Sequence, residues 1–583
     1  MRFLFCAFLC VITMFSHGEG VCAPTLVESE SVHFSLHWVD NTAPVVSNIS
    51  IEGYSGNIVI TYDLADCDGD LCSIFVQYKG SGASDVWTTL TTSDNDTLTG
   101  VAPATGLSLT WQSATDLPNA NGEIYSIRIY ANDGTIDGAK SQYTPVHVIN
   151  SYVFTQLSYY KVYNPQINNS GYVTWAGDFF DENDSHVSRD IYLYNGSDTP
   201  VQITNFDSFA YTPQISDSGS IVWAGIPSSA ETDTEIYYYD GSTVTRLTTN
   251  DHNDGTPQIN SYDKIVWSAS DGNDTEIFLY DGSTITQITD NSYDDNKPQI
   301  NDDGNIVWSG WDGTDWEIYL YNGSTTAITS NSIDDLDPQI NNAGVIVWSG
   351  GNGISSEIYV YKDSATTTIT SNSYEDVQPQ INSDGDIVWA GKNGSDYEIF
   401  LFTPTTPTPT ISQVTTNSRE DLFPKINDAG EITWIGGSGS ASEIYVYSGT
   451  ETTQLTYDSC QDINNQINDS RHITWARWNN TYWEIMLAVP ADLQSIDIIA
   501  LEKMSSLVNL VWYINPPNTK YKLLWRNTLD GSSSWNEVNG DALNDIVNHP
   551  DGTKSWTDNG NDPDMGGESS ADVPKRFYKL ETK

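Results

Sequence analysis

The sequence predicts an all-β protein: an eight-bladed β-propeller of four-stranded blades, flanked by two small β-sandwich domains. Two observations predict the propeller. A segment that reads as four short strands recurs eight times between residues 151 and 490. The 3.6-residue periodicity of amphipathic helices is absent from these repeats. A period of roughly 40 to 45 residues is typical of a propeller blade, because such a sheet needs copies of itself as neighbours to bury both faces.

The clearest copy is PQINDDGNIVWSGWDGTDWEIYLYNGSTTAIT, which runs from Pro298 to Thr329. Gln299–Asn301 predicts a brief first strand, ended by Asp-Asp-Gly. Ile306–Ser309 is β-branched and aromatic and predicts the second strand. Glu317–Tyr321 predicts the third strand, Asn-Gly makes a two-residue hairpin, and Thr326–Thr329 predicts the fourth.

Three positions mark every repeat. The first-strand Pro, replaced by Asn in the last repeat, is found at Pro165, Pro213, Pro257, Pro298, Pro338, Pro379, Pro424 and Asn465. The second-strand Trp is found at Trp175, Trp223, Trp267, Trp308, Trp348, Trp389, Trp434 and Trp475. The acidic residue that opens the third strand is found at Asp190, Glu235, Glu276, Glu317, Glu357, Glu398, Glu443 and Glu484. We expect the recurring Trp and Ile-Tyr positions to pack blade against blade.

The ends of the repeat region, 151–490, predict how the ring closes. The first seven repeats finish with a short strand such as Ile285–Thr289, whereas the eighth stops at Glu484–Val489. Val153–Leu157, before the first repeated Pro, has the sequence of such a final strand. We expect residues 153–157 to complete the last blade and so to remove an exposed sheet edge.

The run D-x-x-P-x-I-x-x-x-G-x-I-x-W, followed by E-I-Y and a T-x-I-T ending, resembles the repeats of TolB-type (WD40-like) β-propellers. The resemblance covers all eight repeats, roughly 340 of the 583 residues. It implies that the Pro lies on the innermost strand of each blade. TolB itself has six blades and an N-terminal α/β domain that this sequence lacks, so a TolB role at the cell envelope does not follow from the resemblance.

Two segments outside the repeats predict smaller domains. Residues 43–150 contain alternating strands such as Val45–Ile51 and Ile124–Tyr130, separated by Gly- and Asn-rich turns. This segment resembles the fibronectin type III-like modules of bacterial secreted proteins, which implies a β-sandwich. Residues 494–583, with strands such as Tyr521–Arg526, look like a second module of this kind.

The net charge and the targeting signals limit which partners and which cellular compartment we expect. The chain has 24 basic and 78 acidic residues, a net charge of -54. Nucleic acid and anionic membranes would repel it, whereas cations and basic partners would not. Residues 1–20 have the charged start, short apolar run and small residues of a signal peptide. No later segment predicts a transmembrane helix. We therefore expect a secreted or periplasmic protein with a protein or glycan ligand.

The N-terminal module contains a compact acidic cluster. Asp66, Asp68 and Asp70 surround a Gly turn and could present several oxygens to Ca²⁺. The closing Glu of a twelve-residue calcium loop is missing, so a simple hairpin tip is the alternative. Cys67 and Cys72 lie across this turn, and we expect them to form a disulfide in an oxidising compartment.

A second acidic pattern lies in the propeller. An Asp stands three residues before the repeated Pro in six consecutive repeats: Asp254, Asp295, Asp335, Asp376, Asp421 and Asp462. These carboxylates would ring one face near the central channel and attract Ca²⁺, another cation or a basic partner. The alternative is that each Asp caps the backbone of its own turn.

Catalytic signals are scarce. The repeats carry His186, His252 and His472 without metal-ligand spacing, and the sequence has no H-E-x-x-H, G-x-S-x-G or phosphate-loop motif. We therefore expect a non-enzymatic binding or scaffold protein that binds a protein, glycan or cation-bridged partner through its propeller surface. The alternatives are an extracellular polysaccharide lyase or hydrolase built on a propeller, and a structural surface-layer component.

Overall fold

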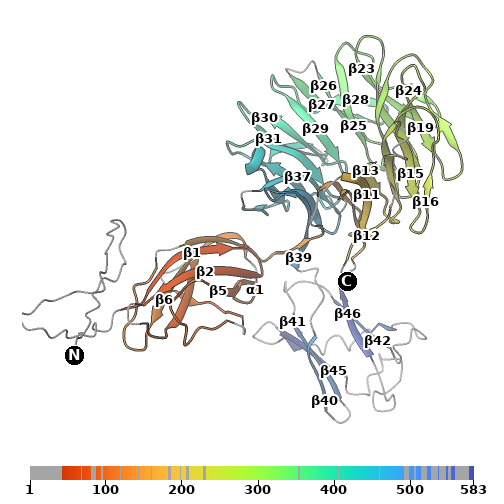
Figure 1. The fold of residues 1–583 in the computed structure, drawn as a ribbon. Coiled ribbons are helices and arrows are strands. Elements are labelled where there is room, and N and C mark those ends of the chain that lie inside the picture. The colour runs from red at the N-terminus through yellow and green to blue at the C-terminus, as the bar shows by residue number, and fades with distance from the viewer. Residues whose placement is uncertain are drawn as a thin grey trace, which may run out of the picture. The chain divides into compact units, whose positions relative to one another are not determined.

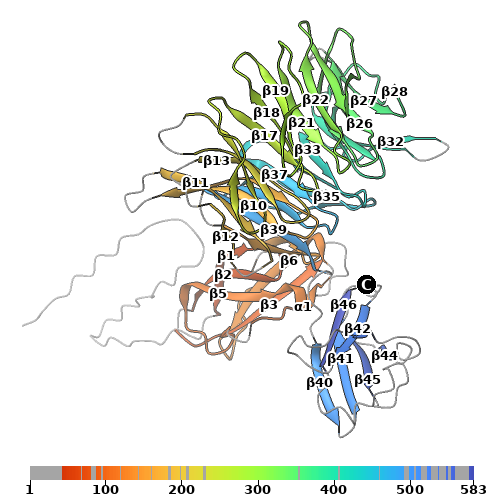
Figure 2. The same cartoon turned by 90° about the vertical axis from the view of Figure 1, so that its right-hand side faces the viewer.

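The computed structural model describes two compact units, divided between Asn150 and Ser151 (Figure 1 and Figure 2). The described residues are 43–491, apart from 67–68, 81–86, 94–95, 119, 142–143, 159–160, 181–185, 197–198, 205–208, 228–231, 352–354, 405–407 and 459. Beyond residue 491, the description covers the backbone of seven strands. No helix in these described parts is both long enough and apolar enough to span a membrane. The predicted signal peptide, residues 1–20, lies outside them.

The first unit contains two antiparallel sheets. One has the order β1 (Val45–Glu52), β2 (Asn57–Ala65), β5 (Ala104–Gln112). The other has the order β4 (Thr88–Thr89), β3 (Ser73–Gly80), β6 (Asn121–Asn132), β7 (Thr144–Ile149). A one-turn helix, α1 (Ser113–Asp116), follows β5.

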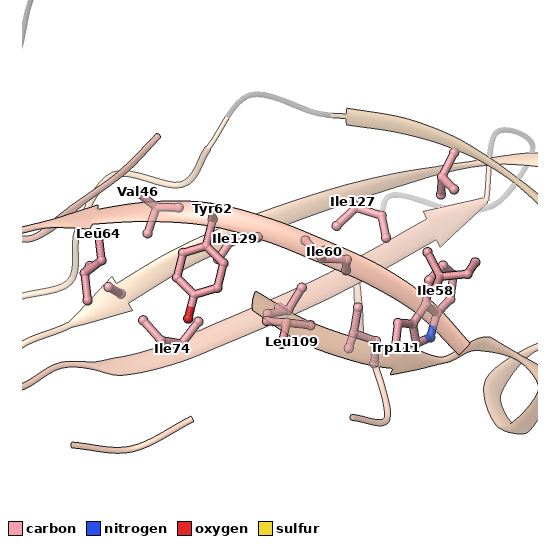
Figure 3. Close-up of a cluster of buried hydrophobic side chains, with 14 of the residues drawn as sticks. Val46, Ile58, Ile60, Tyr62, Leu64, Ile74, Leu109, Trp111, Ile127 and Ile129 are labelled. Carbon is pink, nitrogen blue, oxygen red and sulfur yellow. The ribbon is translucent and has the colours of Figure 1, made fainter. Parts of the chain in front are cut away.

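Both sheets of this unit contribute to one hydrophobic core (Figure 3). Along β2, Ile58, Ile60 and Tyr62 are buried, since successive side chains of a strand point to opposite faces. Leu109 and Trp111 from β5 join them. The alternation of apolar and polar residues in 43–150 therefore corresponds to one buried face of each strand. The two sheets share this core.

The first seven repeats of the second unit form four antiparallel strands each, and the eighth forms three. The first strands are β9 (Val162–Ile167), β13 (Phe209–Ile215), β17 (Asp254–Ile259), β21 (Asp295–Ile300), β25 (Asp334–Ile340), β29 (Asp376–Ile381), β33 (Asp421–Ile426) and β37 (Gln461–Ile467). The second strands are β10 (Val173–Phe180), β14 (Ile221–Ile226), β18 (Ile265–Ser270), β22 (Ile306–Trp311), β26 (Ile346–Gly351), β30 (Ile387–Lys392), β34 (Ile432–Gly436) and β38 (Ile473–Trp478).

The third strands are β11 (His186–Tyr194), β15 (Glu235–Tyr239), β19 (Thr275–Tyr280), β23 (Trp316–Tyr321), β27 (Ser356–Lys362), β31 (Tyr397–Thr403), β35 (Glu443–Tyr447) and β39 (Trp483–Pro490). The fourth strands are β12 (Val201–Gln202), β16 (Val244–Arg246), β20 (Ile285–Gln287), β24 (Thr325–Ala327), β28 (Ala365–Thr368), β32 (Thr410–Gln413) and β36 (Thr452–Gln454). A 3₁₀ turn, η1 (Gly439–Ala441), precedes β35. A parallel bridge between Arg189 and Phe209 joins the sheets of the first two repeats.

The last sheet takes its fourth strand from the start of the unit. β8 (Tyr152–Gln156) pairs with β39, with Gln156 opposite Met486 and Tyr152 opposite Pro490. This is the pairing that the missing final strand of the last repeat led us to expect. The first strands of successive repeats contact one another from β9 to β37, and β37 contacts β9. The sheets lie radially around a common centre (Figure 1), so the arrangement is a β-propeller.

The recurring aromatic positions form the contact between neighbouring sheets. Trp308 is 1% exposed, and its ring stacks on Tyr319 with centroids 5.8 Å apart. Val266 and Ile277, from the preceding repeat, share a cluster with Ile306 and Trp308. The predicted packing of the repeated Trp between blades is confirmed, since all eight are buried.

The C-terminal segment has two further antiparallel sheets. One has the order β40 (Ile498–Met504), β41 (Leu507–Tyr513), β45 (Thr553–Asp558), β44 (Val547–Asn548). The other has the order β43 (Asn536–Glu537), β42 (Tyr521–Arg526), β46 (Phe577–Thr582). The strand character predicted for this segment therefore corresponds to regular sheets.

Candidate functional site at the centre of the propeller

The residue before the repeated Pro has a left-handed backbone in every repeat. Its φ lies between 46° and 57° at Asn164, Thr212, Thr256, Lys297, Asp337, Gln378, Phe423 and Asn464. None of these is glycine, although positive φ is uncommon for other residues and costs roughly 1–2 kcal/mol each. At each of these positions the register between the first and second strands shifts, as between Asn296 and Gln299. Each first strand therefore contains a β-bulge.

We call these eight residues the bulge ring, because neighbouring members contact one another. Lys297 Nζ lies 2.6 Å from Asp337 Oδ1. The backbone N–H of Phe423 donates to Gln378 Oε1 at 2.8 Å. Asn464 Nδ2 donates to Asn164 Oδ1 at 3.2 Å, which links the last repeat to the first. All eight side chains are exposed or half-buried, so the ring presents amides, hydroxyls and the half-exposed Phe423 at the centre of the propeller.

A second set of polar residues lies on the first strands, two positions after each residue of the bulge ring. They are Gln166, Gln214, Gln258, Gln299, Gln339, Gln380, Lys425 and Gln466. All are half-buried. Lys425 Nζ donates to Gln380 Oε1 at 3.3 Å, and burial lowers the pKa of Lys425. Within the described residues no carboxylate forms an ion pair with this lysine, so it is a cationic group among neutral amides.

The six predicted ring aspartates lie elsewhere. All are 0–3% exposed, inside their own sheets. In five of them, one oxygen accepts from the Trp indole N–H of the same repeat, over 2.8–3.1 Å; these are Asp254, Asp295, Asp335, Asp376 and Asp462. The other oxygen accepts from an Asn side chain at 2.6–3.0 Å in Asp254, Asp295, Asp335, Asp376 and Asp421. The expectation that they face the channel as a shared cation site is wrong, because these buried carboxylates hold the Trp and Asn of their own repeats.

Burial also changes the protonation of these carboxyls. Desolvation raises the pKa of all six, to about 6 for Asp254 and well above the usual range for Asp462. Burial also raises the pKa of four of the acidic residues that open third strands, which are Glu276, Glu317, Glu398 and, to about 7, Glu443. Coulombic repulsion between Glu443 and Asp462 adds to the rise for Asp462. Each such carboxyl is stabilised in its neutral form by folding.

A pH dependence of stability follows from Glu443. A carboxyl whose pKa rises on folding contributes stability that is full below the unfolded pKa, 4.5, and is lost as pH rises through about 7. One pKa unit is worth about 1.4 kcal/mol, so the difference approaches roughly 3 kcal/mol. We expect Glu443→Gln to raise the urea midpoint near pH 8 and to leave it almost unchanged near pH 5.

The control for this titration is Glu451→Gln, since Glu451 is exposed in the turn just before β36, which belongs to the same sheet. It should change the midpoint little at either pH. Equal urea midpoints for the parent and Glu443→Gln near pH 8 would contradict the assignment of a raised pKa to Glu443.

The acidic cluster of the first unit is partly described. The N–H of Gly69 donates to Asp66 Oδ1 at 3.2 Å, which is a turn contact. Cys72 is buried and forms no disulfide with another described residue, and burial raises the pKa of its thiol to about 11. Cys67 and Asp68 lie outside the described residues. The disulfide between Cys67 and Cys72, and Ca²⁺ binding by Asp66, Asp68 and Asp70, therefore stay predictions.

A cavity of about 370 Å³ opens beside the third repeat. His252, Asp254, Trp267 and Asp271 are among the residues that line it. Asp254 and Trp267, which are hydrogen-bonded at 3.1 Å, are each 1% exposed and lie at its floor, and the fourth repeat has Tyr293 and Trp311 at the positions of His252 and Ser270.

Sequence reasoning did not find the bulge ring. The residue type at this position varies from repeat to repeat, although it lies between the recurring Asp and the recurring Pro. Residues before Pro usually adopt extended backbone, so the local sequence alone does not indicate a left-handed conformation.

Comparisons with known proteins give a likeness in fold alone. No family model matches the chain, and no curated protein matches it. The β-propeller domain of the Trilobed protease from Pyrococcus furiosus is 14% identical with a TM-score of 0.39, over 52% of this chain and 99% of that chain. A puromycin-hydrolyzing peptidase from Mycobacterium tuberculosis is 10% identical with a TM-score of 0.38, over 55% of this chain and 57% of that chain. TolB from Acinetobacter baumannii is 14% identical with a TM-score of 0.27, over 57% of this chain and 81% of that chain.

Proposed function

We propose that the chain is a secreted or periplasmic, non-enzymatic binding protein. Its architecture in this proposal is an eight-bladed propeller flanked by two fibronectin type III-like β-sandwich modules. The bulge ring is the observation that carries the proposal. Eight non-glycine residues hold a strained backbone at equivalent places, and strain of this kind clusters at binding sites. Because the bulges turn these side chains away from the sheet interior, they are available to a ligand.

The chemistry of the ring favours a ligand rich in hydrogen-bonding groups. Asn164, Thr212 and Asn464 offer amides and a hydroxyl, and Phe423 offers an apolar face that is 50% exposed. This combination suits a glycan, whose hydroxyls pair with amides while its ring packs on an aromatic side chain. A protein loop presents similar groups and is the second class of ligand in this proposal.

The charge distribution supports the choice of ligand. The chain as a whole carries a net charge of -54, so most of its surface repels anions. Lys425 is an exception at the centre, since its ammonium contacts the neutral Gln380. An acidic glycan could place a carboxylate there and be held by hydrogen bonds and charge together.

The test exposes the full chain to neutral and acidic polysaccharides and measures both affinity and release of soluble products. We expect binding without turnover. Phe423→Ala should weaken binding about tenfold, which corresponds to about 1.4 kcal/mol. Tyr262→Ala is the matched control, because Tyr262 is 73% exposed in a turn outside the bulge ring. It should leave the affinity unchanged.

The same experiment separates the alternative functions. New reducing ends or unsaturated products would contradict the binding proposal and support a polysaccharide hydrolase or lyase. Equal loss of affinity in Phe423→Ala and Tyr262→Ala would show that the ring is not the binding site.

A further inference from the structure

Two hairpins of the propeller carry the same acidic arrangement. The turn after β18 and the first two residues of β19 read DGNDTE, and the turn after β22 and the first two residues of β23 read DGTDWE. In the first hairpin the acids are Asp271, Asp274 and Glu276. Within that group, one carboxylate oxygen from each residue lies within 4.8 Å of the others. The same holds for Asp312, Asp315 and Glu317 of the second.

The second hairpin buries two of its carboxylates. Asp315 is 7% exposed and Glu317 is 1% exposed. Asp315 Oδ2 and Glu317 Oε2 are buried and have no hydrogen-bond partner among the residues that the structure describes. Burying a carboxylate without a partner is costly unless the group takes up a proton or faces a cation, and a cation between the two converging carboxylates would stabilise both.

The first hairpin repeats this observation independently. Glu276 is fully buried, and its Oε2 has no hydrogen-bond partner. Both carboxylate oxygens of Asp274 are buried and unpartnered as well. The equivalent hairpins of these two adjacent repeats therefore both contain buried carboxylate oxygens without a hydrogen-bond partner among the described residues.

The two Asp residues, more than the Glu, distinguish these hairpins. The Glu that opens the third strand also has an unpartnered Oε2 in other repeats: Glu235, Glu357, Glu398 and Glu443. Those repeats lack the pair of Asp residues, and the sixth repeat has Asn393 in place of the first Asp. The Glu alone therefore does not make a site, and a complete set of three carboxylates occurs in the third and fourth repeats.

The turn of the second hairpin fixes its ligands. Asp312 Oδ1 accepts from the N–H groups of Thr314 and Asp315, at 2.7 and 3.2 Å. Gly313 has a φ of +103°, and a Cβ there would lie 2.9 Å from the Tyr293 hydroxyl. Tyr293 therefore lies over the turn and restricts the solvent on one side of the acidic group.

We propose that each of these two hairpins binds one Ca²⁺ ion, through Asp271, Asp274 and Glu276 in the third repeat and through Asp312, Asp315 and Glu317 in the fourth. Carboxylate oxygens are the ligands that Ca²⁺ prefers, and it accepts irregular geometry completed by water. Mg²⁺ requires near-ideal octahedral geometry, which two turns of differing sequence are less suited to provide.

The experiment titrates the full chain with CaCl₂ by calorimetry after chelation and dialysis. We expect Asp274→Asn and Asp315→Asn each to bind one Ca²⁺ ion fewer than the parent protein, and the double variant to bind two fewer. Asp281→Asn is the matched control, because Asp281 is an exposed turn residue of the third repeat and loses the same charge. It should keep both sites.

Terbium luminescence gives a second measurement. Trp311 and Trp316 flank the fourth-repeat hairpin with ring centroids 5.7 Å apart, so their excitation should sensitise Tb³⁺ bound beside them. We expect Asp315→Asn to abolish this emission and Asp274→Asn to retain it. Asp312→Asn, at an exposed position, serves if Asp315→Asn fails to fold.

Absence of Ca²⁺ binding in the chelated parent protein would overturn the proposal, as would a double variant that binds as many Ca²⁺ ions as the parent protein. A response to MgCl₂ equal to that with CaCl₂ would overturn the assignment to calcium. None of these outcomes depends on whether the bulge ring binds a glycan.

Discussion

Replacing residues 151–158 by a Gly-Ser linker of the same length is expected to abolish the single cooperative unfolding transition of the propeller. The replacement removes β8, which pairs with β39 from Met486 to Pro490. Tyr152 packs into the cluster that contains Trp475, and Leu157 packs into the cluster that contains Trp175. β8 therefore links the last repeat to the first. Burying each of these side chains contributes about 1.5–3 kcal/mol, and the lost strand pairing adds to this.

Scanning calorimetry of the full chain checks this expectation. The linker variant should melt at lower temperature and over a broader range, because β39 becomes an unpaired edge and the ring can open there. Thr155→Ala is the control, since Thr155 is an exposed residue on the same strand. A linker variant that melts like the parent protein would show that β8 does not close the ring.

Much of the propeller could be predicted from the sequence, because its strands are both short and repeated. Ile306, Trp308 and Ile318 recur at equivalent places, and a repeated apolar pattern survives local variation in turns. The closing strand could be predicted by counting, since the eighth repeat lacks a final strand that Val153–Leu157 supplies. The repeated strands and the closing strand can both be inferred from the order of strands along the chain, without knowledge of side-chain geometry.

The orientation of the repeated Asp could not be predicted in this way. Side chains three residues apart on a regular strand point to opposite faces, so Asp254 and the buried Pro257 should face apart. The left-handed Thr256 inserts an extra residue between them and makes both point inward. The prediction places Asp254 in a loop before the first strand, near the channel, whereas in the structure Asp254 is the first residue of β17 and is 1% exposed.

The acidic hairpins were visible in the sequence and still not selected. The chain has 78 acidic residues, so carboxylates separated by two or three positions are common in it. Asp315 differs from the many turn aspartates because it is buried with an unpartnered oxygen, whereas Asp281 is exposed and bonded to its own turn. Burial depends on neighbours such as Tyr293, which the local motif does not specify.

Trp348→Ala is expected to destabilise the propeller by about 3–5 kcal/mol from the lost packing. Trp348 is 1% exposed, and its ring stacks on Tyr359 with centroids 5.7 Å apart. The substitution also removes the donor to Asp335 Oδ1, which accepts the indole N–H at 2.9 Å. A buried acceptor without its donor costs about 1–3 kcal/mol more. Trp348→Phe retains most of the packing and should show mainly this second loss.

Urea unfolding separates the two contributions. Asp335→Asn combined with Trp348→Phe completes a double-mutant cycle, and we expect a coupling of about 1 kcal/mol or more between the two positions. Trp478→Ala is the control, because Trp478 is half-buried and packs on Trp483 at a hairpin, outside the stacked Trp positions. It should cost less than half as much as Trp348→Ala. Equal losses at Trp348 and Trp478, with no coupling to Asp335, would show that the buried Trp–Asp contact does not hold the sheets together.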